Sequence, residues 1–355
     1  MRSSAAARAD AALSTLVAAV QYNCDVSDAR HARDGALCTY LLGMRELYRW
    51  WAGAAPGVVP DRNAVGAFIA AREAAWDTLH ESGASYRSLP IGAGVEAFDE
   101  AGTDAMLGRR RLVYGGGIGR FGAPVFFLAE RLCEVELDGA RVVYAGAELA
   151  RGVVAPPAMS RGGRIVVRTD AMRRWLWTRA ESPPHRAQAP GFAALIATYG
   201  DTAHDAIERI VTDQAETLAL HEIGEQRAGS LLGGEWERML IALDDRRAES
   251  LVRAVRDLLA DCLVTLPVLA QRGTVPALHF WFANLEGLRR ALAPRLAALW
   301  SPHAVINPDA ILETCAAEQK RQHGTALELL DRWRSGGVRP VQQAVDALLA
   351  AVQGA

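Results

Sequence analysis

A proline-rich segment divides this chain into two stretches with different hydrophobic patterns. Residues 179–191, RAESPPHRAQAPG, contain three prolines and a glycine and interrupt the apolar periodicity found on both sides. The chain has 355 residues, of which 50% are hydrophobic, so it is too long for one typical core and too apolar for intrinsic disorder. We therefore expect two domains, at residues 1–180 and 192–355, joined by a linker at residues 181–191.

The first stretch combines helices with strands. Apolar residues recur there at helical spacing over residues 9–20, 28–51 and 64–79. After Leu107 the pattern changes to runs rich in Val, Phe, Tyr and Leu, and Asp138-Gly139 separates two of these runs. Such a pair favours a hairpin, because both positions of the turn require positive φ. We expect an α+β fold, with N-terminal helices and a small antiparallel sheet closed by a helix at residues 170–177.

The second stretch contains no convincing strand pattern. Its expected helices are separated by Gly or Pro signals and cover residues 192–227, 232–271, 276–299, 308–333 and 338–352. Helices joined by short connections pack as antiparallel neighbours. The sequence therefore predicts an all-α helical bundle for the C-terminal domain.

The charges and apolar runs exclude several classes of protein. The 23 basic and 20 acidic residues up to Pro190 give a net charge of +3, and the 16 basic and 21 acidic residues after it give −5, so neither half favours nucleic acid. No run reaches the roughly 18 to 20 apolar residues of a membrane helix. Asp10 interrupts the region where a signal peptide would be hydrophobic. We expect a cytoplasmic protein whose partner is a small molecule or a protein, and homo-oligomers stay open.

The basic residues also carry a coding signature. Lys320 is the single lysine among the 39 basic residues, and the chain is rich in alanine, as in GC-rich bacterial genomes.

The five cysteines are widely spaced without a CxxC pair, so they form neither a disulfide framework nor a thiolate zinc site. Cys24, His31 and Cys38 are seven residues apart on a helix for which Ser27 is the expected N-cap, which indicates either a thiolate–imidazole pair or a packing seam.

One helical segment carries two HxxxE pairs, His204 with Glu208 and His221 with Glu225, and Glu222 adjoins the second histidine. Residues four apart lie one turn above the other on a helix, so each pair offers an imidazole nitrogen and a carboxylate to one cation. About 27 Å along the helix axis separates His204 from Glu222. One ion therefore cannot use both pairs, and neighbouring helices must complete a site.

Histidines farther along the chain are candidates to complete it. His279 and Glu286 are seven residues apart on one helical face, and His303 and His323 follow. Facing helices of bundles hold non-haem iron or manganese through such histidine and carboxylate sets. The candidate ligands are His204, Glu208, His221, Glu222, Glu225 and His279, for iron or manganese ahead of zinc. Whether the site is catalytic, acting on a small molecule or oxygen at an open coordination position, stays open.

Other interpretations of the same segment remain. HEIGE is similar to the HEIGH helix of zinc peptidases, but Glu225 stands where the second zinc-binding histidine would be. An ion-paired helix surface, with Glu222 or Glu225 meeting Arg227 or an arginine of another helix, explains the same residues. The alternative function is a non-enzymatic interaction protein with a structural bundle. Its partner surface is the small sheet and the helix that carries Arg173, Arg174, Trp175 and Trp177.

The segment YGGGIGRFG matches the dinucleotide-binding glycine pattern at Gly117, Gly119 and Gly122, but it leads into a predicted strand where that motif requires a helix. It is better interpreted as a glycine-rich connection, which could hold an anion with help from Arg120.

The stretches HARDGALCTYLLGMRELYRW, GRFGAPVFFLAE and HEIGE together resemble a bacterial family described only by N-terminal and C-terminal domains of unknown function. The resemblance spans most of the chain and implies that the two halves occur together. It implies no activity and no site residue.

Overall fold

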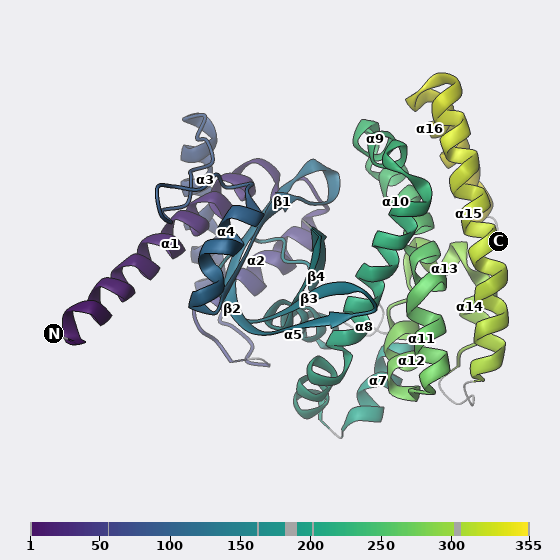
Figure 1. Cartoon of the computed structure of the whole chain (residues 1–355), viewed down its shortest axis with the longest axis horizontal. Helices are drawn as coiled ribbons and strands as arrows, with labels where there is room; N and C mark the ends of the chain where they lie inside the picture. The colour runs from purple at the N-terminus through teal and green to yellow at the C-terminus, as the bar shows by residue number, and fades with distance from the viewer. Residues whose placement is uncertain are drawn as a thin grey trace. The chain divides into compact units, whose positions relative to one another are not determined.

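A computed structural model shows two compact units, Met1–Thr178 and Arg179–Ala355 (Figure 1). The structure describes residues 2–55, 57–161, 163–181, 190–200, 202–301 and 307–353. Most of the predicted linker at 181–191 lies outside these residues. The two units are described one at a time below.

In the part of the chain that the structure describes, the first unit has five helices and two short 3-10 turns: α1 (Arg2–His31), α2 (Leu37–Trp51), α3 (Arg62–Glu81), α4 (Glu100–Leu107), α5 (Thr169–Ala180), η1 (Gly108–Arg110) and η2 (Arg120–Gly122). The single helix predicted over 28–51 is wrong, because the chain turns at 32–36, where Gly35 disfavours helix continuation. Ser27 is not an N-cap. It lies inside α1 and donates a hydrogen bond to the carbonyl oxygen of Pro124 at 2.5 Å.

The sheet of this unit has five strands in the order β1-β2-β3-β5-β4. Their bounds are β1 (Leu112–Ile118), β2 (Pro124–Leu137), β3 (Ala140–Arg151), β4 (Ala158–Arg161) and β5 (Arg164–Arg168). The hairpin is confirmed, since Asp138 (φ 52°) and Gly139 (φ 78°) turn β2 into β3. The sheet is mixed rather than purely antiparallel, because β4 takes the outer edge and β5 then runs back parallel to β3.

The glycine-rich run begins inside a strand and continues into the connection that follows it. Gly115 and Gly117 lie in β1 and pair with β2. A Cβ atom on Gly115 would collide with the ring of Phe127, and one on Gly117 would collide with the guanidinium of Arg161. Glycine is needed here for the close approach of these side chains to the strand. Gly119 and Gly122 lie in the short connection through η2, which leads into the strand β2 and not into a helix, so the pattern is not a dinucleotide loop.

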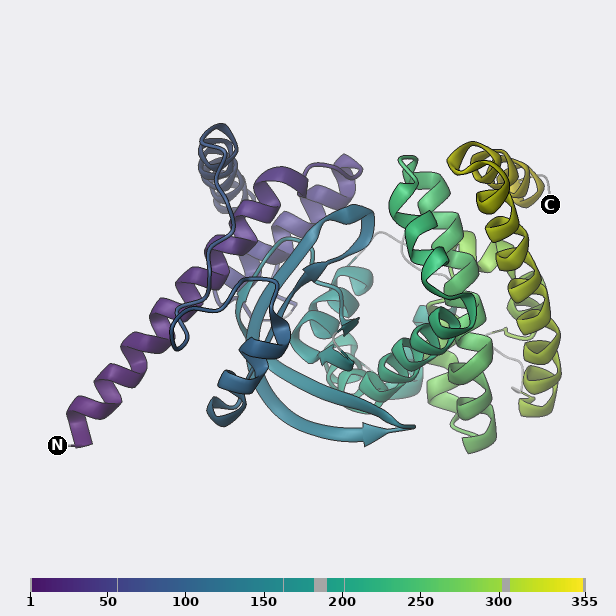
Figure 2. The same ribbon diagram turned by 45° about the horizontal axis from the view of Figure 1, so that its top comes forward.

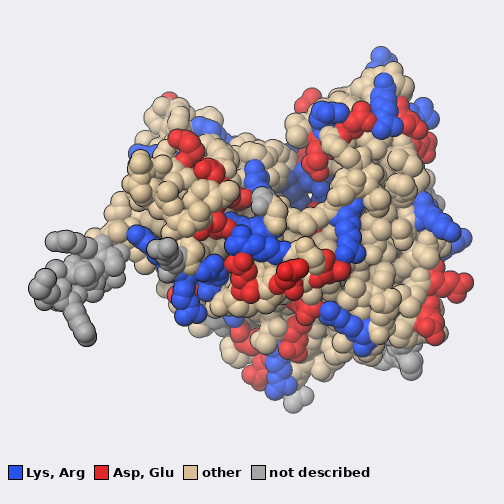
Figure 3. Space-filling model, viewed as in Figure 1, with Lys and Arg blue, Asp and Glu red and all other residues tan. Residues whose placement is uncertain are grey.

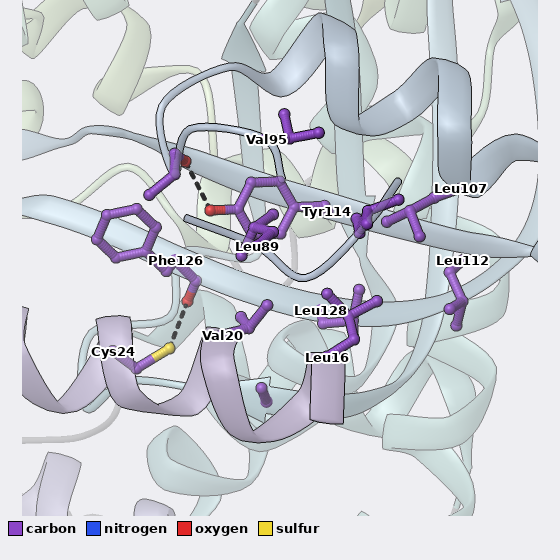
Figure 4. Close-up of a cluster of buried hydrophobic side chains, with 13 residues drawn as sticks. Leu16, Val20, Cys24, Leu89, Val95, Leu107, Leu112, Tyr114, Phe126 and Leu128 are labelled. Atoms are coloured by element: carbon purple, nitrogen blue, oxygen red, sulfur yellow. Dashed lines mark hydrogen bonds between the residues drawn. The ribbon is translucent and has the colours of Figure 1, made fainter. Parts of the chain in front are cut away.

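Helix α1 packs on one face of this sheet (Figure 4). Leu16, Val20 and Cys24 of α1 are buried against Tyr114 and Phe126 of the strands. The Cys24 thiol donates to the carbonyl oxygen of Phe126 at 3.2 Å. The opposite face buries a second apolar cluster: Val113, Phe127, Ala129, Val143, Ala145 and Val166.

The stripe expected from Cys24, His31 and Cys38 does not form. Cys24 is buried in the core of the first unit, His31 ends α1, and Cys38 is exposed on α2. The turn between the two helices breaks the seven-residue spacing. Burial also raises the pKa of the Cys24 thiol well above its ordinary value, so this cysteine behaves as a small apolar core residue.

All regular elements in the described part of the second unit are helical. Its elements are α7 (Pro190–Tyr199), α8 (Ala203–Leu232), α9 (Gly234–Ala242), α10 (Arg246–Ala260), the π-helical turn η3 (Asp261–Thr265), α11 (Leu266–Arg272), α12 (Val275–Ala283), α13 (Gly287–Leu292), α14 (Pro294–Ala298), α15 (Pro308–Gly336) and α16 (Val338–Gln353). Helix α8 packs against α7 and α10, and α15 packs against α10, α11 and α16 (Figure 2).

Three of the predicted long helices are interrupted. The segment 192–227 is divided between α7, which ends at Tyr199, and α8, which Thr202 caps. The segment 232–271 contains α9, α10, η3 and α11, with Asp245 capping α10 by accepting from the backbone N–H groups of Arg247 and Ala248. The segment 276–299 is divided by a break after Ala283 and another at Ala293. Within the described part of the chain, no helix is both long and apolar enough to cross a membrane.

Candidate metal centre

Helices α8 and α10 approach closely at Gly224. This residue lies on α8, three positions after His221, and a Cβ atom there would be 2.8 Å from the carbonyl carbon of Ala260. Ala260 is the last residue of α10. Hydrogen is therefore the only side chain that fits without a shift of the backbone, and polar residues one turn away on each helix are brought together.

The π-helical turn begins immediately after this crossing. Asp261 is its first residue and is completely buried, and Asp257 lies four positions earlier on α10, also buried. A π-helical turn inserts one residue into the helix and is frequent at functional sites. Both carboxylates belong to the cluster around His221, although they stand in an otherwise apolar stretch of sequence.

The imidazole of His221 lies between two carboxylates. Its Nδ1 is 2.8 Å from Oδ1 of Asp261, and its Nε2 is 3.4 Å from Oε1 of Glu225. Asp261 also accepts a hydrogen bond from Arg289. Burial would raise the pKa of Asp261, but Arg289 and His221 outweigh it and hold this pKa below its ordinary value. Asp261 is therefore an anion that fixes the orientation of the imidazole.

A third carboxylate completes the cluster. One ligand atom each from His221, Glu225 and Asp257 lies within 4.8 Å of the other two. Two metal–ligand bonds of about 2.1 Å span roughly 4 Å, so small movements would bring these atoms into a coordination sphere. Arg256 is the neighbouring cation, with Nη2 at 2.6 Å from Oε2 of Glu225 and 3.3 Å from Oδ1 of Asp257.

The charges of the cluster are strongly coupled. Burial lowers the pKa of His221, but Asp261 and Glu225 outweigh it and raise this pKa well above its ordinary value. Burial acts to raise the pKa of Glu225, which Arg256 and His221 nevertheless hold below its usual range. Burial and the charge of Glu225 raise the pKa of Asp257. Without a metal ion, the cluster is thus a protonated imidazole and a guanidinium balanced by carboxylates.

Two chemical roles fit this arrangement. The ion-paired interpretation is supported by Arg256, an arginine of another helix that meets Glu225. The metal interpretation is supported by the histidine nitrogen and two carboxylates, which are donors that suit iron and manganese. A metal-bound histidine usually donates its other ring N–H to a carboxylate, which fixes the orientation of the ring, and Asp261 is placed to accept in this way.

The structure brings together only some of the predicted residues. His221 and Glu225 share the cluster, and Glu222 is buried beside it, where burial and the charge of Glu225 raise its pKa to about 8. His204 and Glu208 lie near the start of α8, several turns from the cluster. The two HxxxE pairs are therefore far apart along α8, as helical geometry predicts.

The histidines expected to complete the site do not do so. Nδ1 of His279 accepts a hydrogen bond from Trp300 at 3.0 Å, which occupies one of its two ring nitrogens, and His279 is not among the residues grouped around His221. Glu286 precedes α13 and accepts from Arg179 at 2.6 Å, because α12 ends before reaching it. His303 lies outside the described residues.

The residues that sequence reasoning missed are Asp257, Asp261, Arg256 and Arg289. Their signal is a pair of acids four positions apart inside the apolar run LLADCLV and its flanks. Buried acids in such a run require partners. The spacing does not say that the partner is His221.

The arginines of the predicted Arg/Trp partner surface make ion pairs within their own helix. Arg173 and Arg174 lie 3.5 and 3.3 Å from the carboxylate of Asp170 on the same helix. Trp177 is buried and would touch a Cβ atom placed on Gly57. On the face drawn in Figure 3, basic and acidic side chains lie next to one another, and the residues coloured there form no extended basic area.

Comparison with known proteins identifies families but no activity. Residues 15–168 match the model described as "Family of unknown function (DUF6866) N-terminal domain", and residues 173–352 match the corresponding C-terminal domain. No curated protein and no solved structure matches the chain.

Proposed function

The chain belongs to the DUF6866 family, and we propose that its C-terminal unit binds one divalent transition metal ion through His221, Glu225 and Asp257. The observation that carries the proposal is the hydrogen bond from His221 to Asp261. When Nδ1 is held by a buried carboxylate, Nε2 is the nitrogen left to bind a metal, and it points toward Glu225.

The donor set favours iron or manganese over zinc. The set holds one imidazole, which suits iron, and two carboxylates, which suit manganese. Carboxylate-rich sets with histidine hold iron or manganese in helical bundles. The five cysteines, all free, contribute no ligand to this set. They also fit the cytoplasmic location that the sequence predicts.

Three protein ligands leave coordination positions for exchangeable groups. Water, oxygen or a small molecule can occupy them, which is the arrangement of catalytic rather than purely structural metal sites. Glu222 is the adjacent group able to hold a proton at neutral pH, since its pKa is about 8. The substrate class is best sought among small molecules that coordinate a metal through oxygen.

The metal content of untagged protein tests the proposal. We expect about one equivalent of iron or manganese in the wild type and less than about 0.2 equivalents in His221→Ala, because the imidazole is the only nitrogen ligand of the set. The matched control is His204→Ala, a histidine of the same helix outside the cluster. It should retain the wild-type content. Less than about 0.2 equivalents in the wild type, also after incubation with each metal, would refute the proposal.

A further inference from the structure

Arg256 occupies the position in the cluster that suits a cation. Its Nη2 lies 2.6 Å from Glu225 and 3.3 Å from Asp257, and both of these are proposed metal ligands. Its Nη1 lies 3.6 Å from Oε1 of Glu237 on α9. The guanidinium therefore stands between the buried carboxylates and a third carboxylate at the surface.

The hydrogen bonds of Arg256 use only part of its guanidinium. A firmly held arginine meets a carboxylate with two parallel N–H bonds, often from Nε and one Nη. Here Nη2 alone donates to both Glu225 and Asp257. The buried Nε has no hydrogen-bond partner among the described residues. Glu237 offers a destination, because its side chain is 55% exposed and already within ion-pair distance.

We propose that Arg256 is an internal cation that holds the cluster when no metal is bound and shifts to Glu237 when the metal enters. This inference rests on the proposed metal site and concerns its regulation. A guanidinium and a metal ion compete for the same carboxylates, Glu225 and Asp257, so the affinity for metal includes the free energy of moving Arg256. The exchange keeps the buried carboxylates neutralised in both states, which avoids the cost of unpaired buried charges.

Equilibrium dialysis of manganese(II) against the chelator-stripped full chain tests the exchange. Arg256→Met removes the competing charge but keeps an unbranched apolar side chain, and we expect it to bind manganese about tenfold more tightly than the wild type. The matched control is Arg253→Met, one turn earlier on α10, where the arginine pairs with Glu249 at 2.7 Å. The control should bind manganese with an affinity within about twofold of the wild type.

Substitution of Glu237 separates displacement from a general effect of charge. Glu237→Gln removes the destination of Arg256, so we expect weaker manganese binding in an otherwise wild-type chain. The same substitution should change nothing in an Arg256→Met background, because no arginine then needs the destination. Loss of a negative charge near the metal would instead weaken binding equally in both backgrounds, and that result would overturn the proposal.

The remaining outcomes are also distinct. Unchanged or weaker manganese binding by a folded Arg256→Met overturns the exchange while leaving the metal site intact. If Arg256→Met fails to fold, Arg256→Gln takes its place in the comparison of the two backgrounds, and equal weakening by Glu237→Gln in both of them overturns the exchange. Absence of binding to every protein, wild type included, would refute the metal site itself.

Discussion

Asp28 shows how one buried carboxyl group makes stability depend on pH. It lies near the end of α1 and accepts hydrogen bonds from the backbone N–H of Val153 at 3.0 and 3.3 Å. Burial is the main cause that raises its pKa to about 7. The folded chain therefore retains a proton on Asp28 at pH values where the unfolded chain has lost it.

Asp28→Asn should flatten this dependence. With a folded-state pKa above the unfolded value, the contribution of Asp28 to stability is complete below its ordinary pKa and is lost as pH rises through about 7. The wild type should lose up to about 1.4 kcal/mol of unfolding free energy per pH unit in this window relative to Asp28→Asn. Urea unfolding at several pH values measures the difference. The exposed variant Asp77→Asn serves as the control, and parallel profiles for wild type and Asp28→Asn would contradict the expectation.

His221 predicts a second pH effect, on metal binding. Because Asp261 and Glu225 keep its pKa well above the ordinary value, His221 is protonated at neutral pH in the metal-free protein. A metal ion must displace that proton, so the affinity for manganese should fall by up to about tenfold for each pH unit below the pKa of His221. Calorimetric titrations in buffers of different ionisation enthalpy count the released protons. Binding without proton release at neutral pH would show that the imidazole is not a ligand.

The residues of the site were only partly predictable. His221 and Glu225 follow from helical spacing, because both lie on one helix. Asp257 and Asp261 belong to other segments of the chain, and their meeting with His221 depends on a helix crossing that no local pattern specifies. His279 offered the same chemistry as His221 in the sequence, but Trp300 takes one of its nitrogens.

At the scale of the helices, Gly224 determines how closely α8 and α10 cross. Its missing side chain allows α8 to touch the end of α10, so Gly224→Ala should force the helices apart and destabilise the C-terminal unit by about 1–3 kcal/mol. The matched control is Gly229→Ala on the same helix, where a Cβ atom would meet nothing within 4 Å. Since alanine favours helix, this control should be neutral or more stable by up to about 1 kcal/mol. Thermal unfolding compares the two, and equal effects would exclude a special role for Gly224.

Elements with local signals were predicted well, whereas those decided by tertiary contacts were not. The Asp138-Gly139 hairpin is specified by its turn residues, and the structure confirms it. The glycines of β1 were mistaken for a loop, because the reason for them is the ring of Phe127 and the guanidinium of Arg161, which belong to other strands. The parallel pairing of β5 with β3 likewise depends on the path of the chain through β4.

At the scale of the whole molecule, the difference in net charge between the two halves of the sequence corresponds to a difference between the two units. The acidic part of the sequence contains the helical unit in which His221, Glu225 and Asp257 meet, together with the two arginines that balance them. The α+β class and the two-domain family were both predictable from the sequence and are confirmed. The metal itself remains the proposal on which the account depends.

Electron paramagnetic resonance of manganese(II) tests this proposal most directly, because the six-line signal of the free ion weakens on binding to protein. We expect that the chelator-stripped wild type removes the free-ion signal until about one equivalent has been added. In His221→Ala, the free-ion signal should grow from the first addition. Growth of the free-ion signal from the first addition in the wild type as well would contradict the metal centre.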